Sequence, residues 1–355
     1  MTLDLRQPAA DLALALVDIP SVSGGEKTLA DAVELALAAL PHLSCLRDGD
    51  AIVARTDLGR VRRVIVAGHL DTVPIAANVP GRLEDGVLWG RGSVDMKGGL
   101  AAMLSAAAGV AAPACDVTWV FYDNEEVALV KSGLGRVIRN HPDWVEGEFA
   151  ILCEPTNASL EGGCNGTVRI VVTALGKAAH AARPWMGVNA IHALAPALDR
   201  LVQFEPATIR VDGLDYREAL NAVGIAGGIA SNVIPDRASL TVNYRFAPDK
   251  TEAQAVRILR ALFTGFEVEV VDSAPAARPG LTNPAAARLA SIVQARGGAA
   301  PKAKQGWTDV ARFASLGIPG VNLGPGDPAL AHQDQEACPA EQIDRVASIL
   351  MEYLS

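Results

Sequence analysis

The sequence predicts an α/β protein: a mixed, mostly parallel sheet covered by helices, with a ferredoxin-like α+β domain inserted into it. Helix-like and strand-like segments alternate in the first half, and near Val168 the order changes to βαββαβ. With 355 residues the chain is also longer than one hydrophobic core usually supports. We therefore predict a discontinuous domain over 1–167 and 279–355, and an inserted domain over 168–278.

The predicted first domain opens with two helices, because apolar residues recur at helical spacing over 9–17 and 26–40. Short runs rich in β-branched residues follow, with a helix of small residues over 97–110 between the first two. Continuous apolar runs of this kind are typical of strands buried on both faces. The predicted strands are 64–67, 117–122, 149–153 and 320–323, and the later helices are 285–294, 309–315 and 341–353.

The predicted inserted domain contains four strands and two helices in the order βαββαβ. Pro196 lies inside the first of these helices and should kink or shorten it, because proline lacks the backbone N–H. A segment rich in Pro, Ala and Gly over 272–284 is expected to lead back to the first domain. The predicted strands are 168–174, 222–230, 238–246 and 266–271, and the helices are 188–202 and 252–263.

Composition and charge exclude several classes of protein. Half of the residues are hydrophobic and one fifth are charged, as in a globular protein. The net charge of −9 gives no general attraction to nucleic acid or to an anionic membrane. No apolar run is long enough to span a bilayer, and Asp4 and Arg6 do not fit a secretory signal, so we expect a cytoplasmic protein. The five cysteines form no CxxC pair and are expected to be reduced.

The first chemical motif follows the strand predicted at 64–67. His69 and Asp71 come just after its carboxyl end, where open α/β sheets hold ligands. His69 can bind a metal through one ring nitrogen while Asp71 accepts a hydrogen bond from the other. A capped loop with a surface histidine explains this motif equally well.

The second motif is a glycine-rich loop over 90–99 that presents Asp95 just before a helix. The loop lacks the Gly-Lys-Ser/Thr ending of a phosphate-binding loop, and its central carboxylate would repel phosphate. Asp95 can cap the helix, or it can bridge two cations.

Adjacent carboxylates at Glu125 and Glu126 follow the strand predicted at 117–122. Such neighbours repel unless a cation neutralises them or one is protonated. One can bind metal while the other acts as a general base toward a water molecule, although a solvated acidic turn is the common alternative. Glu154 and His332 add a carboxylate after a strand and a second imidazole. Two histidines and three carboxylates suit a pair of zinc or similar ions.

In order and spacing, residues 69–74, 92–99, 125–126 and 154–156 resemble the metal-dependent aminoacylase and carboxypeptidase family, over nearly the whole chain. The resemblance implies two Zn²⁺ ions, with Co²⁺ or Mn²⁺ as alternatives, and an amidohydrolase reaction. It implies that Asp95 bridges the ions, that His69 and Glu154 complete one site, and that Glu126 and His332 complete the other. Glu125 then becomes the general base, and Asp71 is expected to be catalytic through its contact with His69.

Residues 176–184 of the inserted domain also resemble this family. There the histidine at position 180 in this numbering hydrogen-bonds the developing oxyanion in the partner subunit's active site, so His180 implies a homodimer formed through the inserted domain. Segments 231–236 and 243–246 resemble the substrate-contacting segments. Arg245 is then expected to bind a carboxylate of the acyl chain, with polar contacts from Asn232 and the backbone of Gly324, although Arg245 can equally be a surface strand residue.

Residues 306–310 and 321–328 resemble the branch of the family that removes a succinyl group from a diamino dicarboxylic acid made for lysine and the cell wall. The expected substrate is a small N-acyl amino acid. Removal of an acetyl group and cleavage of a dipeptide are the alternatives within the family. A catalytically inactive metal-binding regulator is disfavoured because Glu125 and every ligand are present, and a serine hydrolase is disfavoured because no Gly-x-Ser-x-Gly occurs.

Overall fold

The computed structural model describes residues 2–355, which form two compact units. The first unit runs to Gly162 and also contains Pro279–Lys302 and Thr308–Ser355. The second consists of Gly163–Arg278 and Ala303–Trp307. The contact pattern thus assigns residues 163–167 and 303–307 to the second unit. The predicted domain limits at 168 and 278 stay a prediction.

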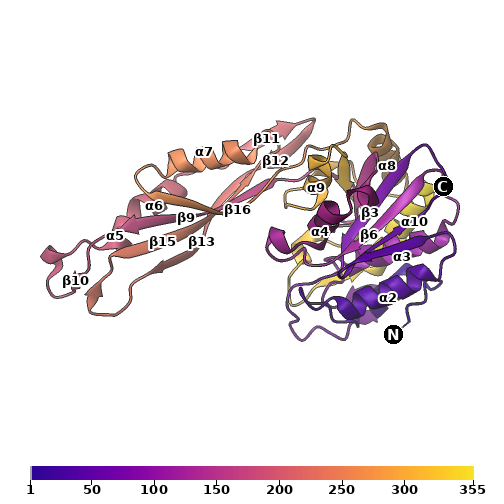
Figure 1. The fold of residues 1–355 in the computed structure, drawn as a ribbon, viewed down its shortest axis with the longest axis horizontal. Helices are drawn as coiled ribbons and strands as arrows, with labels where there is room; N and C mark the ends of the chain where they lie inside the picture. The colour runs from indigo at the N-terminus through magenta and orange to yellow at the C-terminus, as the bar shows by residue number, and fades with distance from the viewer. Residues whose placement is uncertain (1) are drawn as a thin grey trace. The chain divides into compact units, whose positions relative to one another are not determined.

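The first unit is built on an eight-stranded sheet in the order β1-β2-β6-β3-β7-β18-β8-β17, of which β3 and β6 are labelled in Figure 1. The four central strands β6, β3, β7 and β18 are parallel, and the strands at both ends are antiparallel where their pairing is described. This confirms the predicted mixed, mostly parallel sheet. The bounds are β1 Ser44–Asp48, β2 Ala51–Arg55, β3 Arg63–His69, β6 Asp116–Tyr122, β7 Phe149–Leu152, β8 Glu161–Gly162, β17 Lys302–Ala303 and β18 Gly320–Asn322.

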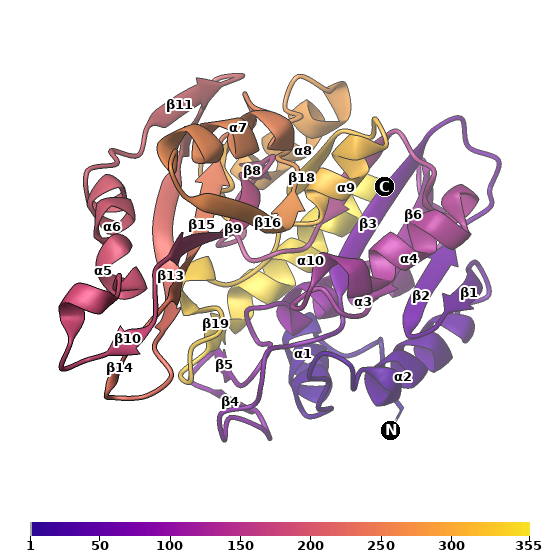
Figure 2. The ribbon, with the colours of Figure 1, turned by 60° about the vertical axis from the view of Figure 1, so that its left-hand side comes forward.

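Helices cover both faces of this sheet (Figure 2). In β6 every residue is buried, with Trp119 and Phe121 in the large core beneath one helical layer and Val120 on the opposite face. Burial on both faces explains why the strand is continuously apolar. The larger layer contains α1 Ala9–Val17, α2 Lys27–Ala38, α3 Lys97–Gly109, α8 Pro284–Ala295 and α10 Ala340–Leu354, and the smaller contains α4 Gly133–Asn140 and α9 Val310–Ser315.

Small residues let the start of α3 lie directly against the end of β7. A Cβ atom at Gly99 would lie 2.2 Å from the carbonyl oxygen of Cys153, and one at Gly98 would lie 2.6 Å from that of Ser93. Neither position tolerates a side chain without backbone movement. The close packing brings the loop that precedes α3 beside the residues that follow β7.

The second unit has the predicted ferredoxin-like order. Its antiparallel sheet, β13-β15-β9-β16, is covered on one face by α5, α6 and α7. Along β9, Val168, Ile170 and Val172 alternate into the core, and Leu240 and Val242 of β15 meet them there. The bounds are β9 Gly166–Leu175, α5 Ala190–Ala193, α6 Ala195–Val202, β13 Ala219–Gly227, β15 Arg237–Phe246, α7 Glu252–Leu262 and β16 Glu267–Ala274.

One helix of this unit is interrupted beside Pro196, as expected, and one hairpin was not predicted. The helix predicted over 188–202 is two short helices that meet at Leu194, with Pro196 in the first turn of α6, where its missing N–H costs nothing. The hairpin of β11 (Thr208–Val211) and β12 (Leu214–Arg217) was not predicted. Its turn residues, Asp212 and Gly213, both have positive φ, as an Asp-Gly hairpin turn requires.

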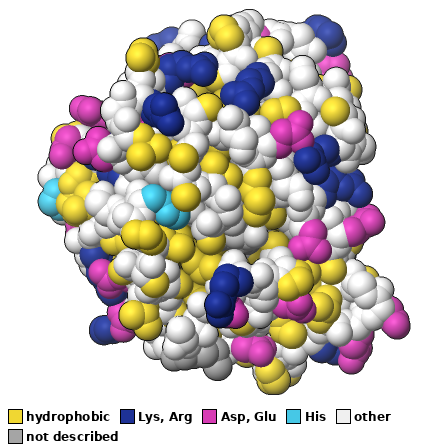
Figure 3. Space-filling model, turned by 90° about the vertical axis from the view of Figure 1, so that its right-hand side faces the viewer, with side chains coloured by type: hydrophobic (Ala, Val, Ile, Leu, Met, Phe, Trp, Pro, Cys, Tyr) yellow, Lys and Arg dark blue, Asp and Glu magenta, His cyan; other side chains and the backbone are white. Residues whose placement is uncertain are grey.

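Three short strands, β4 (Arg82–Glu84), β5 (Val87–Trp89) and β19 (Ala337–Pro339), form a further small sheet that the sequence did not predict. Among residues 2–355 no helix has the length and apolarity needed to cross a membrane. On the face drawn in Figure 3, acidic and basic side chains are interspersed among apolar ones. That face therefore presents no single-sign surface for nucleic acid.

Asp116, the first residue of β6, supports the first unit at the end of the sheet where β3 and β6 begin. Its buried carboxylate accepts hydrogen bonds from Thr56 Oγ1 at 2.8 Å, from the N–H of Leu58 at 2.9 Å and from the N–H of Arg60 at 2.8 Å. Burial opposes ionisation, but these hydrogen bonds hold the pKa of Asp116 below its usual value. The carboxylate therefore fixes the loop between β2 and β3.

Asp116→Asn is expected to lower the free energy of unfolding by about 2 kcal/mol near neutral pH, because an amide cannot accept all three hydrogen bonds. Since the folded-state pKa lies below the unfolded value of about 3.9, this stabilisation is complete above that value and is lost as the pH falls through the folded pKa. Urea unfolding at pH 7 and pH 3.5 checks this. A difference in the free energy of unfolding between wild type and variant that is equal at both pH values would contradict the prediction.

Candidate metal centre

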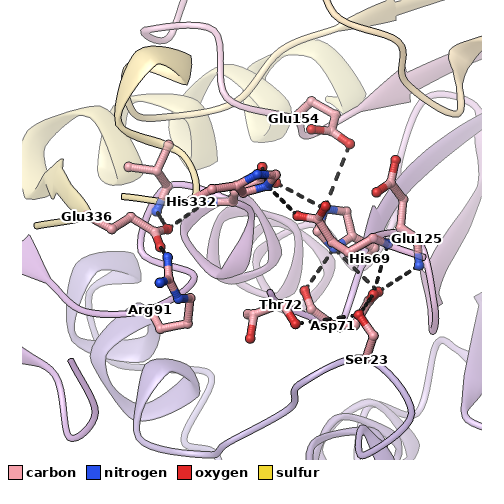
Figure 4. A network of polar contacts seen from close by, with 12 residues as sticks. Ser23, His69, Asp71, Thr72, Arg91, Glu125, Glu154, His332 and Glu336 are labelled. Carbon is pink, nitrogen blue, oxygen red and sulfur yellow. Dashed lines mark hydrogen bonds and ion pairs between the residues drawn. The ribbon is translucent and has the colours of Figure 1, made fainter. Parts of the chain in front are cut away.

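The candidate site lies where the parallel strands of the first unit end. The strands β3, β6, β7 and β18 run in the same direction, so their carboxyl ends share one edge of the sheet. His69 is the last residue of β3, Glu125 and Glu126 follow β6, and Glu154 follows β7. His332 comes from the segment after β18. Figure 4 shows His69, His332, Glu125 and Glu154 turned toward one region.

Asp95 lies between the two imidazoles. His69 Nε2 is 3.1 Å from Asp95 Oδ1 and 3.9 Å from Glu154 Oε1. His332 Nε2 is 3.3 Å from Asp95 Oδ2 and 2.8 Å from Glu126 Oε1. Each oxygen of the Asp95 carboxylate therefore faces a different histidine, and each histidine also lies near a second carboxylate, which is the arrangement expected around a bridging ligand.

The spacing of these donors fits divalent cations. Bond lengths of about 2.0–2.1 Å in a tetrahedral zinc site put neighbouring donor atoms about 3.3 Å apart, and the separations here scatter around that value. Ligand atoms of His69, Asp95 and Glu126 also lie within 4.8 Å of one another. Imidazole nitrogens and carboxylate oxygens suit Zn²⁺, Co²⁺ and Mn²⁺ alike. The predicted ligands come together in a set suited to divalent metal.

The carboxylates beside both histidines favour the protonated form of their imidazole rings. Burial opposes ionisation of His69, but the hydrogen bond to Asp95 and the surrounding carboxylates raise the pKa of its imidazole well above the usual value. Hydrogen bonds to Asp95 and Glu126 raise the pKa of His332 to about 10. Cations that bind here must therefore displace protons, which makes their affinity dependent on pH.

Asp71 has a different contact from the one predicted. His69 Nδ1 lies 2.9 Å from the backbone carbonyl oxygen of Asp71, whereas the nearest carboxylate oxygen is 3.6 Å away. The carbonyl therefore accepts the ring N–H and leaves Nε2 facing Asp95. The Asp71 carboxylate instead accepts hydrogen bonds from the backbone N–H groups of Glu125 at 2.9 Å and Glu126 at 3.0 Å, and from the Ser23 hydroxyl at 2.7 Å.

Glu26 also supports the glutamate pair, and sequence analysis did not single it out. Its buried Oε1 accepts hydrogen bonds from the N–H of Asn124 at 3.1 Å and of Gly24 at 3.0 Å. Two carboxylates, Asp71 and Glu26, thus bind three consecutive N–H groups, those of residues 124–126. Asn124 itself has a φ of 59°, which is uncommon for a residue other than glycine.

Glu125 has the electrostatic environment of a proton acceptor and donor. Burial raises the pKa of its carboxyl well above the usual value; His69 opposes this rise, and the neighbouring carboxylates, Glu154 first among them, add to it. A carboxyl with a raised pKa exchanges protons more readily near neutral pH than an exposed one. Figure 4 shows Glu125 beside His69, without a dashed contact from its carboxylate.

Gly324 is hydrogen-bonded to the segment that follows Glu154. Its N–H donates to Thr156 Oγ1 at 3.0 Å, and its carbonyl accepts from the N–H groups of Thr156 and Ala158. A Cβ atom at this position would lie 2.3 Å from the carbonyl oxygen of Cys153. Both backbone groups of Gly324 thus have partners within the fold, and contact with substrate stays a prediction.

Three predicted site residues belong to the second unit. His180 is exposed in β10 (Ala179–His180), which pairs with β14 (Val233–Ile234). The backbone carbonyl oxygen of Asn232 accepts a hydrogen bond from the N–H of Ala181 at 2.9 Å. The N–H of Ala182 donates to His180 Nδ1 at 3.1 Å, so the neutral ring carries its proton on Nε2 and can donate it elsewhere. The pairing of β10 with β14 therefore brings His180 close to Asn232.

Arg245 lies on β15, opposite Thr167 of β9. Its Nε donates to Asn243 Oδ1 at 3.0 Å, and burial lowers the pKa of the guanidinium. No ion pair joins Arg245 to a carboxylate among the residues that the structure describes, whereas Arg169 on the next strand is 3.7 Å from Asp272. A partly desolvated guanidinium of this kind is suited to an anionic ligand.

Two solved structures with similar folds are a tripeptidase and a metallo-carboxypeptidase. A tripeptidase from Staphylococcus aureus superposes with a TM-score of 0.82 at 22% identity, covering 100% of this chain and 98% of its own. The metallo-carboxypeptidase Sso-CP2 from Sulfolobus solfataricus gives 0.81 at 14% identity and 98% coverage of both chains. At these identities the likeness concerns the fold.

Two curated sequences are much more similar. A putative succinyl-diaminopimelate desuccinylase of Mycobacterium tuberculosis is 50% identical over 99% of both chains. Succinyl-diaminopimelate desuccinylase of Corynebacterium glutamicum is 45% identical over 99% of this chain and 98% of its own. The family model for peptidase family M20/M25/M40 matches residues 65–355. The chain belongs to peptidase family M20/M25/M40 and is a hydrolase of amide bonds.

Proposed function

We propose that this protein hydrolyses N-succinyl-LL-2,6-diaminopimelate to succinate and LL-2,6-diaminopimelate, a step toward lysine and cell-wall precursors in the cytoplasm. The observation that carries the proposal is full-length identity of 50% and 45% with two relatives of that name. An acetylornithine deacetylase of Myxococcus xanthus is 29% identical over 84% of this chain. Removal of an acetyl group is therefore the less favoured reaction.

We further propose that two Zn²⁺ ions, or Co²⁺ or Mn²⁺ in their place, are held by the ligand set around Asp95. His69 and Glu154 would bind one ion, Glu126 and His332 the other, with Asp95 shared between them. Bound cations would polarise the amide carbonyl and make a nearby water more acidic. The distances from each Asp95 oxygen to its own imidazole, 3.1 and 3.3 Å, support a shared carboxylate.

Glu125 is the proposed general base and acid. Its carboxylate takes a proton from the attacking water, and it then delivers that proton to the departing amine nitrogen. Asp71 and Glu26 keep Glu125 in place by binding the backbone on which it lies. The Nε2–H of His180 would donate a hydrogen bond to the developing oxyanion.

Arg245 is the proposed recognition group for the succinyl carboxylate, with Asn232 as a further polar contact. A guanidinium can bind a carboxylate through two parallel hydrogen bonds, and the contact of Nε with Asn243 leaves its terminal nitrogens available. This arrangement would favour succinyl over acetyl groups, because an acetyl group has no second carboxylate.

Zinc titration into chelator-treated protein tests the metal part of the proposal. Succinate release should be absent after chelation and should rise with added Zn²⁺ to a plateau near two ions per chain. Dialysis against buffer without chelator is the control. Succinate release that is equal before and after removal of all bound metal would contradict the proposed centre.

The homodimer is proposed to form through the second unit. β13 is one of the two edge strands of its sheet, and every residue from Asn221 to Gly227 is exposed, including Val223 and Ile225 at 58% and 62%. An apolar, exposed edge strand of this length is a ready template for pairing with another chain. A twofold axis beside β13 would pair it with its own copy, and His180 would then act in the partner's site.

Ile225→Lys is expected to give a monomer of about 37 kDa, because a lysine on an edge strand disfavours strand pairing. Its kcat should fall by about 10²-fold, as when one oxyanion donor is lost. Sedimentation velocity and metal analysis check this, with Val61→Lys in the first unit as the exposed control. A monomeric variant with full activity would contradict the role of His180 in the partner's site.

A further inference from the structure

A buried ion pair joins the segments that carry the metal ligands. Glu336, immediately before β19, is 1% exposed, and Arg91, in the glycine-rich loop, is 3% exposed. Arg91 Nη1 donates to Glu336 Oε2 at 2.9 Å. These residues are 245 positions apart in the sequence, and neither is among the proposed metal ligands (Figure 4).

The other oxygen of Glu336 holds the backbone of the bridging ligand. Glu336 Oε1 accepts hydrogen bonds from the N–H of Val94 at 2.9 Å and from the N–H of Asp95 itself at 3.1 Å. The carboxylate therefore fixes the peptide on which the Asp95 side chain is mounted. A rotation of that peptide would move both oxygens that face His69 and His332.

Arg91 extends the same support to two more segments. Its Nη1 also donates to the carbonyl oxygen of Gln333, the residue after His332, at 3.1 Å. Its Nε donates to the carbonyl oxygen of Pro74, in the loop that follows His69 and Asp71, at 3.1 Å. A planar guanidinium can hold such a divergent set of acceptors in a fixed geometry, which a lysine ammonium cannot.

The backbone of His332 has an uncommon conformation that neighbouring contacts must hold. His332 has a φ of 64°, a left-handed conformation that residues other than glycine seldom adopt, and its side chain is half-exposed. Such a conformation persists when surrounding contacts fix it. The neighbouring contacts include those of Gln333 with Arg91 and of Glu336 with the Asp95 loop.

We propose that Glu336 and Arg91 are positioning residues that set the geometry of the metal pair by fixing the Asp95 peptide and the His332 segment. The inference rests on the metal centre of the proposed function and adds two residues that bind neither metal nor substrate. Groups that orient metal ligands typically change metal affinity by about 10–100-fold when they are removed. Loss of one partner would also leave the other as a buried, unpaired charge.

The test compares Glu336→Gln with Asp116→Asn. Both replace a buried carboxylate that accepts two backbone N–H groups in the first unit, but Asp116 is at the opposite end of β6 from the site. Co²⁺ affinity is measured by calorimetry, and the ligand-field absorption of bound Co²⁺ reports the coordination geometry. Glu336→Gln should weaken Co²⁺ binding by about 10–100-fold and shift the spectrum, whereas Asp116→Asn should change neither.

Arg91→Lys is the second variant. It keeps a positive charge beside Glu336 but removes the hydrogen bonds from the guanidinium to the carbonyl oxygens of Gln333 and Pro74. It should weaken Co²⁺ binding and alter the spectrum in the same direction. If the wild type binds two ions and both variants keep the same Co²⁺ affinity and spectrum, the inference is wrong while the proposed metal centre stands. Equal weakening by Asp116→Asn would overturn the inference as well, because the effect would then be one of general stability. Absence of Co²⁺ binding in the wild type would overturn the proposed metal centre and the inference with it.

Discussion

Glu125→Gln is expected to lower kcat for succinate release by about 10³-fold while leaving metal affinity and the free energy of unfolding nearly unchanged. Glutamine has almost the same shape but cannot take a proton from water or return one to the amine. Because Asp71 and Glu26 bind the backbone of residues 124–126 and not this side chain, the loop should keep its conformation.

Steady-state kinetics and Co²⁺ titration of the purified variant check this prediction. Glu148→Gln, an exposed glutamate of the same unit, is the matched control and should retain wild-type turnover. A Glu125→Gln variant that binds two ions and keeps full kcat would remove Glu125 as the base. A variant that has lost its metal would show that the residue acts as a ligand.

Arg245→Met should lower kcat/KM for the succinyl substrate by at least about 100-fold and should change kcat/KM for an acetyl substrate much less. Two charge-assisted hydrogen bonds to the succinyl carboxylate would be lost, and each is worth about 1.5–3 kcal/mol. Methionine keeps the length and apolar character of the arginine stem, so the packing on β15 should persist.

Arg237→Met is the matched control for this prediction. Arg237 is also on β15, eight residues before Arg245, and its guanidinium contacts Thr173 Oγ1. The control variant should leave the ratio of kcat/KM for the succinyl substrate to kcat/KM for the acetyl substrate unchanged. Equal losses for succinyl and acetyl substrates with Arg245→Met would mean that the arginine supports the sheet and does not recognise the acyl group.

The sheet could be predicted because it depends on local sequence, whereas the roles of the proposed ligands were implied by the family resemblance. Apolar β-branched runs mark β3, β6 and β7, and His69, Glu126 and Glu154 lie within a few residues of their ends. In a parallel sheet those ends share one edge, so residues distant in sequence are expected to meet there. The break before Pro196 was predicted for an equally local reason, the missing N–H of proline.

The contacts that support the site could not be predicted in the same way. Glu26 and Glu336 lie in segments without a motif, and their partners, Asn124 and Asp95, are 98 and 241 residues away. The carboxylate of Asp71 binds the loop after β6 and not the histidine two residues before it, because tertiary packing brings that loop closer. The hairpin at Asp212 and Gly213 was missed although its turn residues are a local signal.

The most direct test of the account is the comparison of N-succinyl-LL-2,6-diaminopimelate with N-acetylornithine as substrates of the zinc-loaded protein, with a chelator-treated sample beside it. The account predicts succinate release that the chelator abolishes, and a kcat/KM at least about 100-fold higher for the succinyl substrate. A preference for the acetyl substrate would contradict the proposed desuccinylase function while leaving the metal centre intact. Hydrolysis that persists without metal would contradict the proposed mechanism.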